Sequence, residues 1–127
     1  MAVSPLIKFF CLINAKTAMI PTNASQTLNL DWILNNITAQ SYIYMHFAEI
    51  QNLEANQIRE FNITYNGGLL WYDFFRPSKL STTIIYNPRA VSSPDGKFNF
   101  TFTVTGNSSL PPLINGLEIY SLGFFTA

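Results

Sequence analysis

Strict alternation of apolar and polar residues over residues 97–105 is the feature that most constrains the fold of this chain. One parity holds Phe98, Phe100, Phe102 and Val104, and the other holds Lys97, Asn99, Thr101 and Thr103. Successive side chains of a β-strand point to opposite faces, so the first set is predicted to be buried and the second solvated. The segment is therefore expected to be a half-buried antiparallel strand that needs a second layer over its phenylalanines.

A β-hairpin is predicted next to a second alternating segment, residues 59–65. Its expected inward residues are Phe61, Ile63 and Tyr65, and its outward residues are Asn62 and Thr64. Asn66 and Gly67 follow and tolerate positive φ, and residues 69–72 are strand-like again. Strand, Asn-Gly, strand is the strongest short-range hairpin signal.

Further strands are expected at 27–32, 41–50, 81–86 and 113–125, with prolines marking the loops. Segment 41–50 is apolar on both faces, so it is predicted to lie centrally and covered on both sides. The apolar run 9–13 is interpreted as a strand rather than a signal peptide, for which it is short. Short strands at regular spacing predict an all-β, antiparallel, jelly-roll-like sandwich, with residues 1–127 forming a single domain.

Composition excludes several functions. Hydrophobic residues make up 48% and charged residues 11%, which is incompatible with disorder. Seven basic residues balance seven acidic ones without a basic run, so no nucleic-acid partner is expected. The single Cys11 and the single His46 offer neither a disulfide framework nor a set of metal ligands, so no metal or cofactor is expected, and His46 is interpreted as a satisfied sheet histidine. The chain has no stretch long enough for a membrane-spanning helix.

Five glycosylation sequons, Asn-X-Ser/Thr, occur in the chain. They lie at Asn23, Asn36, Asn62, Asn99 and Asn107. Alternation independently assigns Asn62 and Asn99 to solvent. Glycosylation of some of these residues is predicted, and the alternative is a plain polar surface.

The aromatic cluster Trp71, Tyr72, Asp73 and Phe74 is the candidate ligand-binding site. Aromatic rings beside a carboxylate are typical of sugar sites, and Tyr, Trp and Arg dominate binding hot spots. Alternation places Trp71, Asp73 and Phe75 on one face and the other two rings on the opposite face. The alternative is that most of these rings belong to the core.

Three charged residues are assigned structural roles. Glu49 and Arg59 are expected to pair across the loop between their strands, and Glu118 lies in an apolar strand. A glycosidase would need two carboxyls such as Glu49 and Glu118 about 5 to 10 Å apart in an open cleft. No feature of the sequence supports that spacing, and the chain is predicted not to be an enzyme.

A family resemblance runs through three blocks of the sequence. They are residues 42–67, residues 69–73 with Pro77, and residues 105–120, in which Asn115-Gly-Leu-Glu118 stands where the family usually has Asn-Ala-Leu-Glu. These blocks resemble the malectin-like domain of plant leucine-rich-repeat receptor-like kinases, and residues 17–121 match best. Two such units usually stand in tandem in that family, and the chain resembles a truncated second unit, so its N-terminal strands are expected to be incomplete.

The resemblance implies an extracellular or membrane-anchored recognition module, without the kinase domain of the family. Its expected partners are cell-wall carbohydrate or a secreted peptide, and a second malectin-like unit or a co-receptor. An exposed patch including Trp71 or Tyr72 would favour ligand recognition. Bare sheet edges and an apolar docking face would favour a structural fragment without its own ligand.

Overall fold

The computed structural model describes residues 2–3, 7–12, 19–23, 27–34, 40–79, 81–122 and 124–125. Within these ranges the regular structure is entirely strand. The strands are β1 (Ala2–Val3), β2 (Ile7–Leu12), β3 (Leu28–Ile33), β4 (Gln40–Phe47), β5 (Phe61–Tyr65), β6 (Leu69–Phe75), β7 (Thr83–Tyr86), β8 (Lys97–Val104), β9 (Gly116–Leu122) and β10 (Phe124–Phe125).

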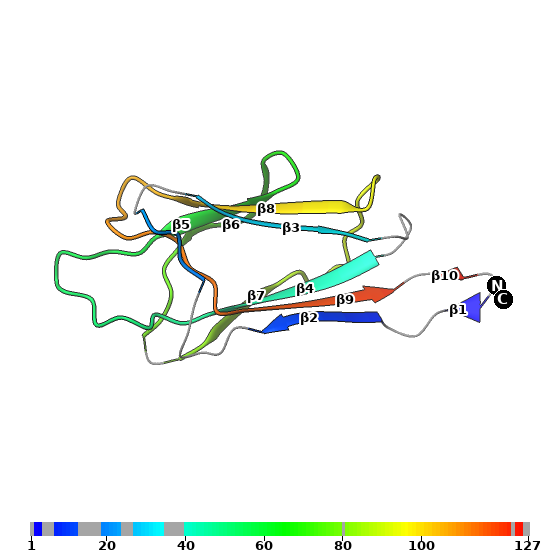
Figure 1. Cartoon of the computed structure of the whole chain (residues 1–127), viewed down its shortest axis with the longest axis horizontal. Helices are drawn as coiled ribbons and strands as arrows, with labels where there is room; N and C mark the ends of the chain where they lie inside the picture. The colour runs from blue at the N-terminus through cyan, green and yellow to red at the C-terminus, as the bar shows by residue number, and fades with distance from the viewer. Residues whose placement is uncertain are drawn as a thin grey trace.

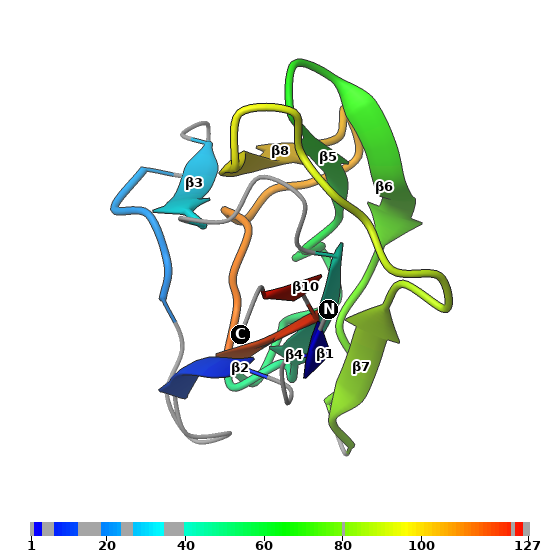
Figure 2. The ribbon, with the colours of Figure 1, turned by 90° about the vertical axis from the view of Figure 1, so that its right-hand side faces the viewer.

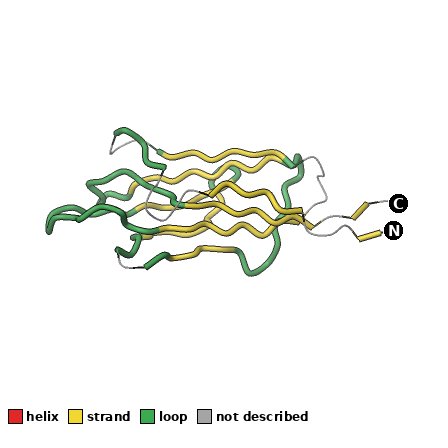
Figure 3. The backbone as a smooth tube through the Cα atoms, turned by 60° about the horizontal axis from the view of Figure 1, so that its bottom comes forward, coloured by secondary structure: helices red, strands yellow, loops and turns green. Residues whose placement is uncertain are grey.

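Two four-stranded antiparallel sheets form the layers of a sandwich (Figure 1). One has the order β3-β8-β5-β6 and the other β2-β9-β4-β7, while β1 and β10 make a short separate pair. Figure 3 shows this pair at one end of the molecule, beside both termini. The predicted all-β antiparallel sandwich is confirmed.

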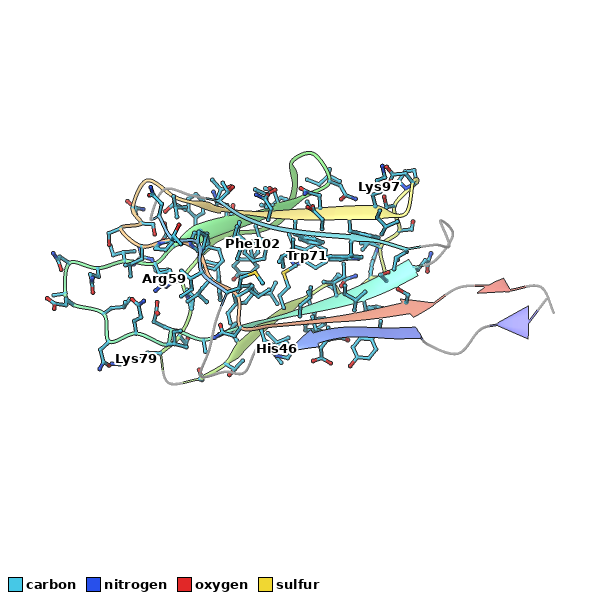
Figure 4. The ribbon with its side chains drawn as sticks, viewed as in Figure 1. His46, Arg59, Trp71, Lys79, Lys97 and Phe102 are labelled. Carbon is cyan, nitrogen blue, oxygen red and sulfur yellow. The ribbon has the colours of Figure 1, made fainter. Side chains whose placement is uncertain are left out.

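The core lies between the sheets and is rich in phenylalanine. Phe98, Phe100 and Phe102 of β8 are buried, as their alternation predicts, and Phe61 and Ile63 of β5 lie beside them. Trp71 and Phe102 both point into the space between the layers (Figure 4). Burying a large apolar side chain stabilises the fold by about 1.5–3 kcal/mol, so each side chain of this row contributes to the stability of the sandwich.

β4 occupies the centre of its sheet, between β9 and β7, as expected. Ile43, Met45 and Phe47 face inward and are buried. The outer side chains of β4, including Tyr44 and His46, are only half-buried, so the prediction that both faces are covered is wrong. Aromatic and imidazole rings can remain at a solvated face because each has a polar tip. The segment predicted at 9–13 is described as β2, two residues earlier, paired with β9.

The predicted hairpin joins β5 and β6. Asn66, Gly67 and Gly68 have φ of 46°, 86° and 110°. Glycine takes such angles without steric penalty, and asparagine is among the few other residues that tolerate them. Asn66 also bonds β8, because its Oδ1 accepts from the Asn99 amide at 2.9 Å.

Candidate functional surfaces

The edge strand β6 carries the largest group of exposed apolar side chains among the described residues. Leu69, Leu70, Tyr72 and Phe74 are 56%, 62%, 47% and 64% exposed. Asp73 between the two rings is exposed as well. These five residues are called the β6 surface below. Within the described part of the chain, β5 pairs with one side of β6 and no strand pairs with the other. In Figure 2, β6 and the edge strand β7 lie on the same side of the sandwich.

Two β-bulges explain why β6 departs from simple alternation. Ile63 pairs with Tyr72 whereas its neighbour Thr64 pairs with Leu70, which leaves Trp71 as an extra residue. Phe61 then pairs with Phe75, so Asp73 and Phe74 together face the single residue Asn62. Each bulge inserts one residue and shifts the following side chains by one position. The predicted grouping of Trp71, Asp73 and Phe75 on one face is therefore wrong for Asp73.

Phe74 is held in an unusual conformation at the second bulge. Its φ is 51°, in the left-handed region that bulky residues avoid at about 1–2 kcal/mol. The Phe74 amide donates to Oδ1 of Asn62 at 2.8 Å, and this bond offsets part of the strain. Strain of this kind concentrates at functional sites, and bulges often redirect a side chain there. Here the result is a phenylalanine ring presented to solvent.

Trp71 belongs to the core side of β6 rather than to its exposed surface. Its ring meets Phe100 edge-on at 5.0 Å between centroids and Tyr65 at 5.4 Å. The indole Nε1 is buried without a hydrogen-bond partner among the described residues. Of the four predicted ligand-binding residues, Tyr72, Asp73 and Phe74 are thus exposed together, and Trp71 supports them from within.

A charged network anchors the chain just after β6. The Arg76 Nε donates to Oε2 of Glu60 at 2.6 Å, and the Thr105 hydroxyl donates to Oε1 at 2.6 Å. The Thr105 hydroxyl, followed by the Arg76 guanidinium, holds the pKa of Glu60 below its ordinary value. Arg76, just after β6, is paired with Glu60. Asp73 is the charged residue within β6, so it is the charge that this strand offers to a partner.

Glu49 and Arg59 form a buried ion pair at the ends of their strands. Arg59 donates from Nε to Oε1 of Glu49 at 2.7 Å and from Nη2 to Oε2 at 3.3 Å. Its Nη1 donates to the Pro111 carbonyl at 2.6 Å. The pair therefore closes the loop between β4 and β5 and ties it to the loop between β8 and β9. With Glu49 enclosed by this pair, it is not available as one carboxylate of an open glycosidase cleft.

Glu118 lies on the outer face of the other sheet, in a cluster of tyrosines that the sequence did not reveal. Its Oε1 lies 2.7 Å from Nε2 of His46, and its Oε2 accepts from the Tyr120 hydroxyl. Tyr44 stacks on Tyr86 at 5.2 Å between centroids and meets Tyr120 edge-on at 5.6 Å. Tyr42 is the register partner of Tyr120. We call the four tyrosines the tyrosine face. Strand pairing, which sequence alternation does not supply, is what brings them together.

The predicted sequons have different surroundings. Asn23 and Asn107 are exposed loop residues, whereas Asn36 lies outside the described residues. Asn62 and Asn99 both lie on the outer face of the β3-β8-β5-β6 sheet. Asn99 also lines an open depression of about 440 Å³ with Asp95 and Lys97. Hydrogen bonds from the Lys97 amide and the Ser93 hydroxyl lower the pKa of Asp95 there.

The described residues show neither a metal centre nor a membrane span. Within them, no group of three or more histidine, cysteine or acidic side chains is placed to hold a metal ion. They also contain no helix long and apolar enough to cross a membrane. What the geometry offers is an exposed aromatic edge and a tyrosine-rich sheet face on a two-layered sandwich.

Comparison with known proteins gives the family. The malectin-like domain model matches residues 13–122, and this chain belongs to that family. A probable leucine-rich-repeat receptor-like protein kinase of Arabidopsis thaliana, At1g51890, is 68% identical over 108 residues, 85% of this chain. The Arabidopsis receptor kinase IOS1 is 43% identical over 107 residues. The chain spans 12% of the length of each of these two relatives.

Solved structures show the same fold. The ANXUR2 extracellular domain of Arabidopsis thaliana aligns with a TM-score of 0.62 at 19% identity, over 85% of this chain and 32% of that one. The plant receptor-like kinase ANX1 aligns with a TM-score of 0.64 at 18% identity, over 84% of this chain and 31% of that one. At this identity the likeness establishes the sandwich alone, while the family model and the relatives establish that the chain is a malectin-like domain.

Proposed function

We propose that this chain is an extracellular recognition module that binds an extended peptide of a secreted or cell-surface partner along the β6 surface. The observation that carries the proposal is the clustering of Leu69, Leu70, Tyr72 and Phe74, all exposed, on one edge strand. Soluble proteins normally blunt an edge with charges, prolines or β-bulges, because an open apolar edge pairs with other chains, and β6 keeps its four apolar side chains exposed beside its two bulges. An edge left apolar is typical of an interaction site.

A peptide suits this edge better than a rounder ligand. The free side of β6 presents main-chain N–H and C=O groups, and another extended backbone satisfies such groups by strand addition. Tyr72 and Phe74 supply aromatic anchors of the kind that dominate hot spots. The exposed Asp73 between them favours a basic residue on the peptide, since opposite charges give an interface its specificity.

The test is selection of binders from a phage-displayed library of random 12-residue peptides. We expect Tyr72→Ser and Phe74→Ser each to weaken binding of a selected peptide at least tenfold. Ile33→Ser is the matched control, because Ile33 is 67% exposed on the opposite edge of the same sheet, and it should change binding less than twofold. Equal affinity in all three variants would refute the proposal and favour a structural docking face.

Main-chain recognition has its own signature. N-methylation removes a peptide donor without changing the side chain. Only every second residue of an added strand donates its N–H to β6. Methylation of those residues should abolish binding, and methylation of the residues between them should leave it intact. Equal tolerance of both phases would show that side chains alone hold the peptide.

A second candidate function, neutral carbohydrate binding, is favoured by the tyrosine face. Flat phenol rings cover the apolar face of a sugar, and their hydroxyls meet its polar edge. The side chains of His46 and Glu118 are directed at each other, so this part of the sheet suits an uncharged ligand. A glycan array should then give binding that Tyr44→Ala abolishes and Tyr72→Ser does not change. Glycan binding that survives Tyr44→Ala would exclude this face.

A further inference from the structure

We propose that Asn62 controls access to the β6 surface: its side chain holds Phe74 in its exposed position, and a glycan on the same residue covers it. The inference rests on the proposed function of the β6 surface and adds its regulation. Two features coincide in the Asn62 side chain. Asn62 begins the sequon Asn62-Ile63-Thr64, and its carbonyl oxygen accepts the amide of Phe74 at 2.8 Å.

The two roles use different atoms of the Asn62 amide. Glycosylation attaches sugar to Nδ2, whereas the bond to Phe74 uses Oδ1. In the described residues Nδ2 of Asn62 has no hydrogen-bond partner. A glycan can therefore be present without breaking the bond that stabilises the bulge, and it would begin beside the Phe74 backbone.

The other sequon on this face is different. Nδ2 of Asn99 donates to Oδ1 of Asp31, so its glycan-accepting atom is already engaged in the folded sheet. Asn99 also lies on β8, which β5 separates from β6. Asn62 and Thr64 lie on β5, the strand paired with β6, and both are only partly covered. A glycan at Asn62 thus begins beside Asp73 and Phe74, the part of the β6 surface that faces Asn62, while one at Asn99 does not.

The backbone conformation of Phe74 is the reason why Asn62 would act as a positioning residue. A bulky residue at φ 51° needs support from its surroundings, and the Asn62 oxygen bonds the amide of that same residue. Removing the acceptor leaves the Phe74 amide without its partner, so the ring should lose its fixed direction. Occupancy of the sequon, set during secretion, would then divide the protein into a masked pool and an open pool.

Four variants separate the two roles. Thr64→Ala removes the sequon but keeps Asn62, whereas Thr64→Ser keeps both and is the control. Asn62→Asp keeps an oxygen acceptor without a sequon, and Asn62→Leu removes both. Each is secreted from insect cells, and peptide mass spectrometry measures occupancy at Asn62. We expect the wild type and Thr64→Ser to be glycosylated there.

Access is measured by hydroxyl-radical footprinting of Tyr72 and Phe74, which requires no ligand. Oxidation of both rings should rise at least threefold in Thr64→Ala and in Asn62→Asp relative to the wild type. The Phe74 amide should exchange hydrogen at least tenfold faster in Asn62→Leu than in Asn62→Asp. An unoccupied Asn62, equal footprints, or equal exchange would each overturn the inference.

Binding of a peptide selected on the unglycosylated chain adds the functional readout. Thr64→Ala should bind at least tenfold more tightly than the glycosylated wild type, and Asn62→Leu should bind more weakly than Asn62→Asp. If footprints change as expected but no peptide binds any variant, the proposed function fails while the masking by glycan stands. If peptides bind all glycoforms equally, the masking fails while the proposed function stands.

Discussion

The two edge strands of the β3-β8-β5-β6 sheet pack on the same core but differ in the regularity of their pairing and in the side chains that they expose. β3 pairs with β8 in six consecutive positions without a bulge, and Asn29 and Asp31 make its outer side polar up to the exposed Ile33 at its end. β6 pairs with β5 through two bulges and exposes four large apolar side chains. Both edges still place a tryptophan against Phe100, Trp32 at 5.3 Å and Trp71 at 5.0 Å. The edges therefore share one core, and only β6 departs from what stability alone requires.

Removing the shared core ring should have the largest effect. Phe100→Ala deletes the contacts of both tryptophans and of Tyr65, and we expect a loss of about 3–5 kcal/mol in the free energy of unfolding. Urea denaturation followed by tryptophan fluorescence measures it. Thr101→Ala, the next residue on the outward face, should cost no more than about 1 kcal/mol. Equal losses would show that β8 does not divide buried from solvated side chains.

The buried ion pair comes next. Arg59→Met leaves Glu49 enclosed without its partner, which typically costs about 3–5 kcal/mol. The same denaturation assay measures the loss. A second variant, Arg59→Met with Glu49→Leu, should recover part of it, and no recovery would place the loss in packing rather than in charge.

Phe74→Gly and Ile33→Gly should change stability in opposite directions, by about 1 kcal/mol or less. Glycine relieves the positive φ of Phe74, whereas at Ile33 it weakens a regular strand. Thermal unfolding of the two variants against the wild type measures this difference between the edges. A loss of stability in both would mean that the bulge holds no strain.

Lowering the pH should remove the stability contributed by Glu60, the carboxylate that anchors the chain after β6. The pKa of Glu60 is lowered in the folded state, so its contribution is complete above its ordinary pKa of 4.5 and is lost as the pH falls through the lower folded value. Glu60→Gln should therefore flatten the dependence of stability on pH below about 4.5. Denaturation at several pH values between 2 and 7 measures it. An unchanged slope would assign the acid sensitivity to other carboxyls.

Much of the fold follows from period-two patterning. The alternation of Phe98, Phe100 and Phe102 predicted the buried face of β8, and Asn66-Gly67 predicted the turn of the β5–β6 hairpin. Local rules suffice in both cases because β8 keeps its register with both of its neighbours, and the turn of the hairpin lies before the first bulge of β6. The bulges at Trp71 and Phe74 could not be predicted, because an extra residue is accommodated by the partner strand rather than by its own neighbours.

The surfaces were harder to predict than the layers. Tyr72, Asp73 and Phe74 were identified from residue type alone, and their exposure depends on the bulges. The tyrosine face combines residues of β4, β7 and β9, which lie far apart in the sequence. The partial exposure of Tyr44 does not follow from the sequence, because an aromatic run looks apolar on both faces. Each tyrosine nevertheless keeps a polar tip that tolerates solvent.

Hydrogen–deuterium exchange with and without a selected peptide tests the central claim, that β6 is the recognition edge, most directly. We expect slower exchange of the amides of Leu69–Phe75 in the complex and no change in Leu28–Ile33. Protection of Leu28–Ile33, or of the strands that carry the tyrosine face, with residues of β6 unchanged, would contradict it.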